Sequence, residues 1–384
     1  MKKVIRIVLA VLLCIVLACA AAFAVFYASR LRTLASVEQL SAYEDGYNLY
    51  RMNVCYDYSI ERMIARGIDD DQAMIDTVLK EALPLLPVKL KAPAFGCTAF
   101  TVRDTESGVH MGRNYDFKND TSAMLVYCAP KNGYRSVAFA ALDNVSANTP
   151  EQSRKQKIAA LTAPFICLDG MNEKGVSIAV LTLDSAPTHQ KNGKPTIFTT
   201  LAIRLVLDRA ASTAEAVALL GEYDMLATSG RDYHFYITDA AGDGRVIEYD
   251  CESEARTLVA TPIEAVTNFF ILYKDRVLPN QKNGIYGHGK ERYDAVLDVL
   301  AEQPRPSSET VWAALRASSQ EPNPKDITSN TQWSIHFFNT NGTLEVTLRR
   351  HWQDRFAYSL SENTVTRAEY LPEQPSPKID SKGT

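Results

Sequence analysis

The sequence predicts an antiparallel α+β body that follows an apolar N-terminal segment. Two observations predict this class. Short strand-like stretches come in pairs, separated by turns that contain Gly, Asn or Asp, which is typical of β-hairpins. Helix-like stretches come in blocks, whereas a parallel βαβ fold would alternate them with single strands. The sequence shows no internal repeat.

The composition excludes several functional classes. The 384 residues include 41 Lys and Arg against 45 Asp and Glu, a formal charge of −4, whereas sequence-independent nucleic-acid binding needs an excess of basic residues. With 46% hydrophobic residues the chain is too apolar to be disordered. Its seven Cys are too few for a disulfide scaffold, and no two form a C-x-x-C pair. We therefore expect a globular protein without nucleic acid, metal or other cofactor.

The first 30 residues have the features of a signal peptide or a transmembrane anchor. Three basic residues lie within the first six, and the uncharged run over residues 7–27 has about the 20 residues that span a bilayer as a helix. Ala22-Phe23-Ala24 fits a signal cleavage site, so a cleaved signal and a retained anchor both stay open. Lipid attachment at Cys19 is disfavoured by the bulky residue two positions earlier, and a buried core helix by the basic start. We expect the body to lie outside the cytoplasmic membrane.

Residues 35–86 carry a helical pattern. Apolar residues recur every three or four positions over 60–64 and 71–83. Pro84 and Pro87 mark the end of this stretch.

From residue 97 the pattern changes to paired strands. Strands are predicted over 97–103, 109–115, 123–128 and 136–142, around a turn at 171–175, over 233–238 and 245–249, and on both sides of a turn at 339–342. Helices are predicted over 196–210, 214–220, 291–301 and 309–317, the second opening with a capping box at 212–215. The Pro-rich residues 372–384 are predicted to form a disordered tail.

Common catalytic motifs are absent from the sequence. It contains no G-x-S-x-G elbow, no phosphate-binding P-loop and no H-E-x-x-H zinc helix. The six His are scattered. His234 lies inside an alternating strand and is interpreted as a packed side chain, and His288 lies in a loop with no visible partner. A papain-type pairing of Cys with His stays open on spacing alone.

Cys97 stands at the start of the first predicted hairpin. A short hairpin returns the end of its second strand to the start of its first, so Arg113 and Asp116 are predicted to lie beside Cys97. An Arg near a thiol favours the thiolate, and a carboxylate there can hold an amine. The alternative is a buried Cys with a purely structural role.

These residues also resemble a known family. Phe95-Gly96-Cys97-Thr98-Ala99-Phe100 together with the segment 112–117 resembles the choloylglycine hydrolase and penicillin V acylase family of N-terminal-nucleophile hydrolases. Acid ceramidase and acyl-coenzyme A:6-aminopenicillanic acid acyltransferase are relatives of that family. Further similar segments follow in order at 169–176, 266–268, 291–293 and 331–334. The resemblance implies a four-layer αββα fold.

The resemblance also implies roles for individual residues. Cys97 would be the mature N-terminal residue and the nucleophile, with its own α-amine as the base. An α-amine titrates near ~7.7–8, so it can accept a proton at neutral pH and no His partner is needed. Arg113 would lie by the sulfur and Asp116 by the amine. Asn268 would donate to the oxyanion, and Arg292 would be the second active-site Arg. Thr182 stands at an oxyanion or substrate position where bile-salt hydrolases carry Asn.

One departure from many relatives is that 96 residues precede Cys97. The resemblance therefore implies cleavage between Gly96 and Cys97, and our hypothesis is that Cys97 cuts this bond itself. The predicted organisation is a signal peptide or anchor over 1–30, a helical propeptide-like segment over 31–96, a catalytic domain over 97–371 and a tail over 372–384.

The function that these expectations imply is hydrolysis of a linear amide C–N bond in a small acyl-amide or acyl-amino-acid substrate. Two alternatives stay open: an acyltransferase that uses the same Cys with an amine acceptor, and a non-catalytic cell-surface protein. The sequence does not separate bile-salt conjugates, penicillin V-like amides, N-acyl homoserine lactones and fatty-acid amides. It also leaves a homo-oligomer open.

Overall fold

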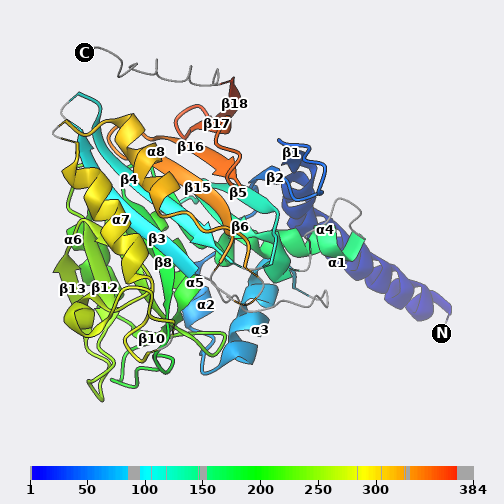
Figure 1. Cartoon of the computed structure of the whole chain (residues 1–384). Coiled ribbons are helices and arrows are strands. Elements are labelled where there is room, and N and C mark those ends of the chain that lie inside the picture. Colours follow the sequence, from blue (N-terminus) through cyan, green and yellow to red (C-terminus); the bar gives the residue numbers. More distant parts are fainter. Residues whose placement is uncertain are drawn as a thin grey trace, which may run out of the picture.

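Two β-sheets lie face to face, and helices cover the outer side of each (Figure 1). The computed structural model describes residues 2–84, 96–104, 106–117, 119–145, 147, 154–282, 284–303, 305–323, 325 and 329–369. The predicted tail over 372–384 lies outside these residues. The layers form the predicted αββα arrangement.

The sheet that carries Cys97 has seven strands within the described residues, and every neighbouring pair is antiparallel. Its order is β14 (Ala265–Val266), β3 (Gly96–Asp104), β4 (Gly108–Asp116), β15 (Thr331–Phe338), β16 (Thr343–Leu348), β17 (Asp354–Ser359) and β18 (Thr364–Glu369). The helices α7 (Lys290–Ala301) and α8 (Ser308–Ala317) pack on its outer face.

The facing sheet has nine strands within the described residues. Its order is β1 (Glu38–Gln39), β2 (Leu49–Asn53), β5 (Ala123–Cys128), β6 (Ser136–Ala141), β7 (Asp169–Asn172), β8 (Ser177–Leu183), β11 (Asp232–Thr238), β12 (Arg245–Tyr249) and β13 (Leu258–Pro262). Helices α5 (Thr199–Arg209) and α6 (Thr213–Leu220) cover its outer face. Strands β6 and β8 are buried along their whole length because both faces of the sheet are covered.

Smaller elements complete the fold. They are α4 (Arg154–Ala159), the parallel pair β9 (Thr196–Phe198) and β10 (Asp224–Leu226), and the 3₁₀ helices η1 (Leu142–Val145), η2 (Ala160–Phe165) and η3 (Ile271–Arg276). The predicted helix over 196–210 is thus too long, since its first three residues form β9. The predicted hairpins are confirmed, including β3–β4 and β15–β16.

The helical prediction for residues 35–86 is only half right. Helices α2 (Ile60–Ile64) and α3 (Asp71–Ala82) form where the apolar spacing predicted them. Residues 38–53, however, form β1, a connecting turn and β2. Strand β2 pairs in parallel with β5, and this pairing with a distant strand overrides the local preference. The segment before Cys97 is therefore part of the nine-stranded sheet.

The N-terminal helix α1 (Lys2–Ala35) projects from the body as the long dark-blue helix of Figure 1. Within the described residues it is the one helix long and apolar enough to cross a membrane, a test that a signal sequence also passes. Its last turns are attached to the body. Arg30 donates to the carbonyl oxygens of Ala82 (2.7 Å) and Glu81 (2.8 Å) at the end of α3. These bonds satisfy carbonyls that a helix C-terminus leaves unpaired.

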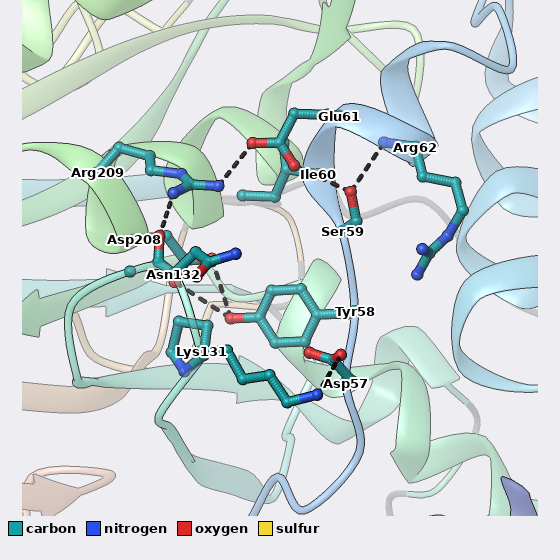
Figure 2. A pocket seen from close by; sticks show the side chains of 12 residues that line it. Asp57, Tyr58, Ser59, Ile60, Glu61, Arg62, Lys131, Asn132, Asp208 and Arg209 are labelled. Carbon is teal, nitrogen blue, oxygen red and sulfur yellow. Dashed lines mark hydrogen bonds and ion pairs between the residues drawn. The ribbon is translucent and has the colours of Figure 1, made fainter.

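Polar contacts join the segment before Cys97 to the body. These contacts lie around a pocket with a volume of about 170 Å³, and Figure 2 shows the side chains that line it. The Tyr58 hydroxyl donates to the carboxylate of Asp208 at 3.0 Å. Glu61 pairs with Arg209 at 2.6 Å on the other side of the pocket. The side chains in this pocket are engaged with one another, and they hold residues 57–61 against α5.

Candidate active site

The β3–β4 hairpin positions the candidate nucleophile. Gly96 lies opposite Asp116 and Cys97 opposite Tyr115 in the antiparallel register, as the sequence predicted. Side chains alternate between the two faces of a strand, so Cys97, Arg113 and Tyr115 share one face and Asp116 lies on the other. The Cys97 side chain is fully buried. The hairpin therefore brings Arg113 and Asp116 to Cys97 from opposite sides of the sheet.

Arg113 lies between the two sheets and is fully buried. Its Nε lies 3.1 Å from Oδ2 of Asp169 in β7, and its Nη2 donates to the carbonyl oxygen of Val180 in β8 at 2.9 Å. The Trp333 indole N–H also donates to Oδ2 of Asp169 at 3.1 Å, and the Trp333 ring stacks on Tyr115. These contacts across the two sheets fix the guanidinium beside the sulfur.

Burial and the neighbouring charges shift the pKa of the Cys97 thiol in opposite directions. Burial raises its pKa to about 12, because the charged thiolate loses its hydration. The positive charge of Arg113 acts in the opposite direction, and the negative charge of Asp116 adds to the effect of burial. Without a base, this thiol is neutral at physiological pH.

Asp116 lies on the outer face of the seven-stranded sheet. Its Oδ1 accepts a hydrogen bond from the Thr331 hydroxyl at 2.7 Å, and its Oδ2 accepts one from Gln320 Nε2 at 2.9 Å. Arg292 Nη1 lies 3.5 Å from Oδ2. Burial raises the pKa of the Asp116 carboxyl, and the charge of Arg292 opposes this.

Asn268 lies just beyond the edge strand β14. Continuing the register of β14 against β3 by two residues places it opposite Cys97. Its Oδ1 accepts the backbone N–H of Cys97 at 2.8 Å, and its Nδ2 donates to both the carbonyl and the hydroxyl oxygen of Thr182, at 2.9 and 3.1 Å. The amide oxygen thus faces the nucleophile, and the predicted oxyanion donor Nδ2 faces Thr182.

Arg292 connects these groups from the first turn of α7. Its Nη1 donates to the carbonyl oxygen of Cys97 at 2.8 Å and to the Thr98 hydroxyl at 3.0 Å. Its Nη2 donates to Oδ1 of Asn268 at 2.8 Å. Gly289, at the helix N-terminus, has φ +85°, and a Cβ there would lie 2.4 Å from Nη2 of Arg292. Glycine adopts this positive φ without strain, and its missing Cβ leaves room for the Arg292 guanidinium.

The structure thus brings all the predicted site residues together around Cys97. It also adds four residues to which the sequence alone assigned no role. Asp169 and Trp333 hold Arg113, and Thr331 and Gln320 hold Asp116. Three of the four lie in segments similar to the family, at 169–176 and 331–334. That similarity was the one available signal, because their contacts join strands far apart in sequence.

The two His singled out in the sequence differ in their surroundings. His234 is buried as predicted, with Nε2 2.9 Å from the carbonyl oxygen of Thr267 and Nδ1 3.2 Å from Glu248. His288 has a partner that the sequence did not reveal, since its Nδ1 lies 2.7 Å from Oδ2 of Asp184. Among the described residues, no group of His, Cys, Asp and Glu is arranged to hold a metal ion.

Comparison with solved structures identifies the fold. A penicillin V acylase from Agrobacterium tumefaciens is similar with a TM-score of 0.50 and 17% sequence identity, over 71% of this chain and 91% of that one. A mutant conjugated bile acid hydrolase from Clostridium perfringens is similar with a TM-score of 0.52 and 15% identity, over 72% of this chain and 97% of that one. A second variant of that hydrolase gives 0.51 and 15%, over 74% and 100%.

The sequence itself matches a family model. The match covers residues 97–255 and belongs to the linear amide C–N hydrolases, choloylglycine hydrolase family. It begins at Cys97, the residue on which the contacts described above converge. This match shows that residues 97–255 are similar to that family, and the solved structures show that the chain shares their fold.

Proposed function

We propose that Cys97 is the nucleophile of an amidase that cleaves a small acyl-amide or acyl-amino-acid substrate through a thioester. The observation that carries this proposal is the hydrogen bond from the backbone nitrogen of Cys97 to Oδ1 of Asn268. This nitrogen becomes an α-amine once the bond after Gly96 is cut. The base and the thiol then belong to the same residue, so the site needs no His.

In the proposed reaction the α-amine of Cys97 takes the proton of the thiol, and the thiolate attacks the amide carbonyl carbon. A C–S bond forms, and the C–N bond breaks as the ammonium returns a proton to the leaving amine. Water then attacks the thioester, releases the carboxylic acid and restores the thiol. Arg113 stabilises the thiolate by its charge, which offsets part of the effect of burial on the pKa of Cys97.

Asn268 and Thr182 are proposed to act together at the oxyanion. Nδ2 of Asn268 already donates to two oxygens of Thr182. It serves the oxyanion by exchanging one of these bonds for the substrate oxygen as negative charge develops there. Because Thr182 supplies an alternative acceptor, Nδ2 stays satisfied in the empty site.

We propose that Cys97 also activates itself. The thiol attacks the carbonyl carbon of Gly96, the peptide C–N bond breaks and the α-amine is freed, and water hydrolyses the resulting thioester. In support of this step, Oδ1 of Asn268 and the guanidinium of Arg292 hold both backbone polar atoms of Cys97 in place. Residues 31–96 would then be a propeptide-like segment, and α1 a membrane anchor or export signal with the body outside the cytoplasmic membrane.

A panel of acyl-amides tests the proposal, with released amine as the readout. The panel includes acyl-amino acids, phenoxyacetyl amides, fatty-acid amides and bile-salt conjugates. Cys97→Ser is expected to lose activity toward every substrate that the wild type cleaves. Cys55→Ser is the matched control, because Cys55 is exposed and lies outside the site. Activity that survives Cys97→Ser unchanged would end the proposal.

A further inference from the structure

A second cavity lies where α1 meets the body. It has a volume of about 500 Å³, within the range of small-molecule pockets. Its walls come from α1, β1, β2, β5, η1, α4 and η2, and include Leu31, Leu34, Tyr50, Met124 and Ile158. None of the residues assigned to the candidate active site lines it. The cavity is therefore separate from the site around Cys97.

The lining of this cavity suits a hydrocarbon chain. Most of its side chains are aliphatic or aromatic, and the polar exceptions are Gln39 and Lys157. Lys157 is exposed and belongs to α4. An apolar cavity with an ammonium group at one place matches an amphipathic ligand with an anionic end.

The position of the cavity relative to α1 indicates the source of that ligand. The uncharged run of α1 ends at Tyr27, and Leu31 follows one helical turn later, about 6 Å along the axis. Leu31 is 63% exposed and continues the apolar surface that α1 presents from Val4 onward. If residues 7–27 cross a bilayer, the cavity opens at the level of the lipid headgroups.

The cavity is held at this level by the attachment of α1. Beside the bonds of Arg30 to the end of α3, the Thr33 hydroxyl accepts the backbone N–H of Cys55 at 2.8 Å. The Ser36 hydroxyl accepts the backbone N–H of Asn53 at 2.9 Å. The body cannot turn away from the membrane without breaking these bonds.

We propose that this cavity binds the acyl chain of a membrane phospholipid, with Lys157 next to the phosphate. A lipid fits better than a protein segment because the cavity is continuous with the apolar surface of α1, and lipid surrounds that surface when α1 lies in a membrane. The inference requires α1 to lie in the membrane, and it does not require Cys97 to be the nucleophile.

Photolabelling tests the proposal. The full chain is reconstituted into vesicles of phosphatidylcholine and phosphatidylglycerol that contain a phosphatidylcholine with a diazirine near the end of one acyl chain. After illumination, labelled peptides are mapped by mass spectrometry. We expect label on the peptides that carry Met124 and Ile158, in addition to α1. The Cys97→Ser variant should be labelled as strongly as the wild type. The labelling result therefore does not depend on whether the proposed hydrolase activity is correct.

Two matched substitutions make the test specific. Ile158→Trp fills part of the cavity, whereas Leu278→Trp adds the same ring at an exposed position outside it. Each buried methylene contributes a factor of about four to lipid affinity, so losing two lowers labelling of the body about 16-fold. Labelling of α1 alone, no labelling of either part, or equal labelling in both variants would overturn the proposal. Thermal unfolding of each variant verifies that it is folded.

Discussion

The backbone N–H of Cys97 donates a 2.8 Å hydrogen bond to Oδ1 of Asn268, across 171 positions of sequence. The same oxygen accepts Nη2 of Arg292 at 2.8 Å. Two donors on one side fix the orientation of the amide, since its NH₂ group would be repelled there. The orientation in turn directs Nδ2 toward Thr182.

This arrangement predicts unequal effects of two substitutions on turnover. Asn268→Ala removes the proposed donor to the oxyanion and is expected to lower kcat by about 10²–10³-fold. Thr182→Val keeps the carbonyl acceptor of Nδ2 and removes only the hydroxyl, a loss of about 0.5–1.5 kcal/mol and thus about tenfold or less. Steady-state kinetics on the best substrate of the panel measures both. Equal losses would show that Asn268 acts only by ordering Thr182.

The charge of Arg113 is predicted to control the reactivity of Cys97. Because burial raises the thiol pKa and Arg113 opposes it, Arg113→Met should raise that pKa further. Each unit of upward shift reduces the thiolate fraction, and so the rate of iodoacetamide labelling at neutral pH, about tenfold. The pH profile of Cys97 labelling is the measurement.

Arg113→Lys serves as the control for this effect, since it keeps the charge opposite Asp169. A smaller shift than in Arg113→Met is expected. If the methionine variant labelled with the wild-type pH profile, Arg113 would have no influence on the thiol.

A buried His pair is predicted to make stability depend on pH. His110 Nδ1 lies 2.9 Å from His336 Nε2, and both side chains are buried. Burial lowers the pKa of both, so each binds a proton more readily in the unfolded chain. Their contribution is therefore fully present above the unfolded value of about 6.5 and is lost as pH falls toward the lowered folded values.

Chemical unfolding between pH 7 and 5 measures this dependence. We expect the free energy of unfolding to fall by on the order of 1–2 kcal/mol over that range. His336→Gln should flatten the slope, whereas His189→Gln, at an exposed position, should leave it unchanged. If the free energy of unfolding fell equally with pH in the wild type and in both variants, the His110–His336 pair would not be its cause.

The segment before Cys97 is predicted to stay bound after cleavage. Leu49, Met52, Ile60 and Met63 are buried in the common core, and each such side chain contributes about 1.5–3 kcal/mol. Strand β2 also hydrogen-bonds to β5. An affinity tag within residues 31–96 should therefore retain residues 97–384 in mild detergent, even at high salt, because the association is mainly apolar. Release of an active body by salt alone would refute this.

Local sequence patterns predicted the β3–β4 hairpin well. Alternation and a turn at 104–108 were sufficient to place Arg113 and Asp116 beside Cys97. Asn268 and Arg292 have no local signal, and only the resemblance to a family pointed to them. Their contact with Cys97 depends on the pairing of β14 with β3, which is a tertiary event.

The same reason explains what the sequence did not reveal. Strand β2 was predicted as helix because its partner β5 lies over seventy residues away and local propensity does not register that pairing. The sequence alone assigned no role to Asp169. Its carboxylate holds Arg113 and Trp333, and both of these side chains reach it from the opposite sheet. The partner of His288, Asp184, is likewise distant in sequence.

In the proposed mechanism Cys97 acts with its own freed α-amine. Intact mass and N-terminal sequencing of the purified, active protein test it most directly. We expect two fragments that separate between Gly96 and Cys97, the second beginning at Cys97, and a single uncut chain for Cys97→Ala. An uncut wild-type protein with full amidase activity would contradict the claim.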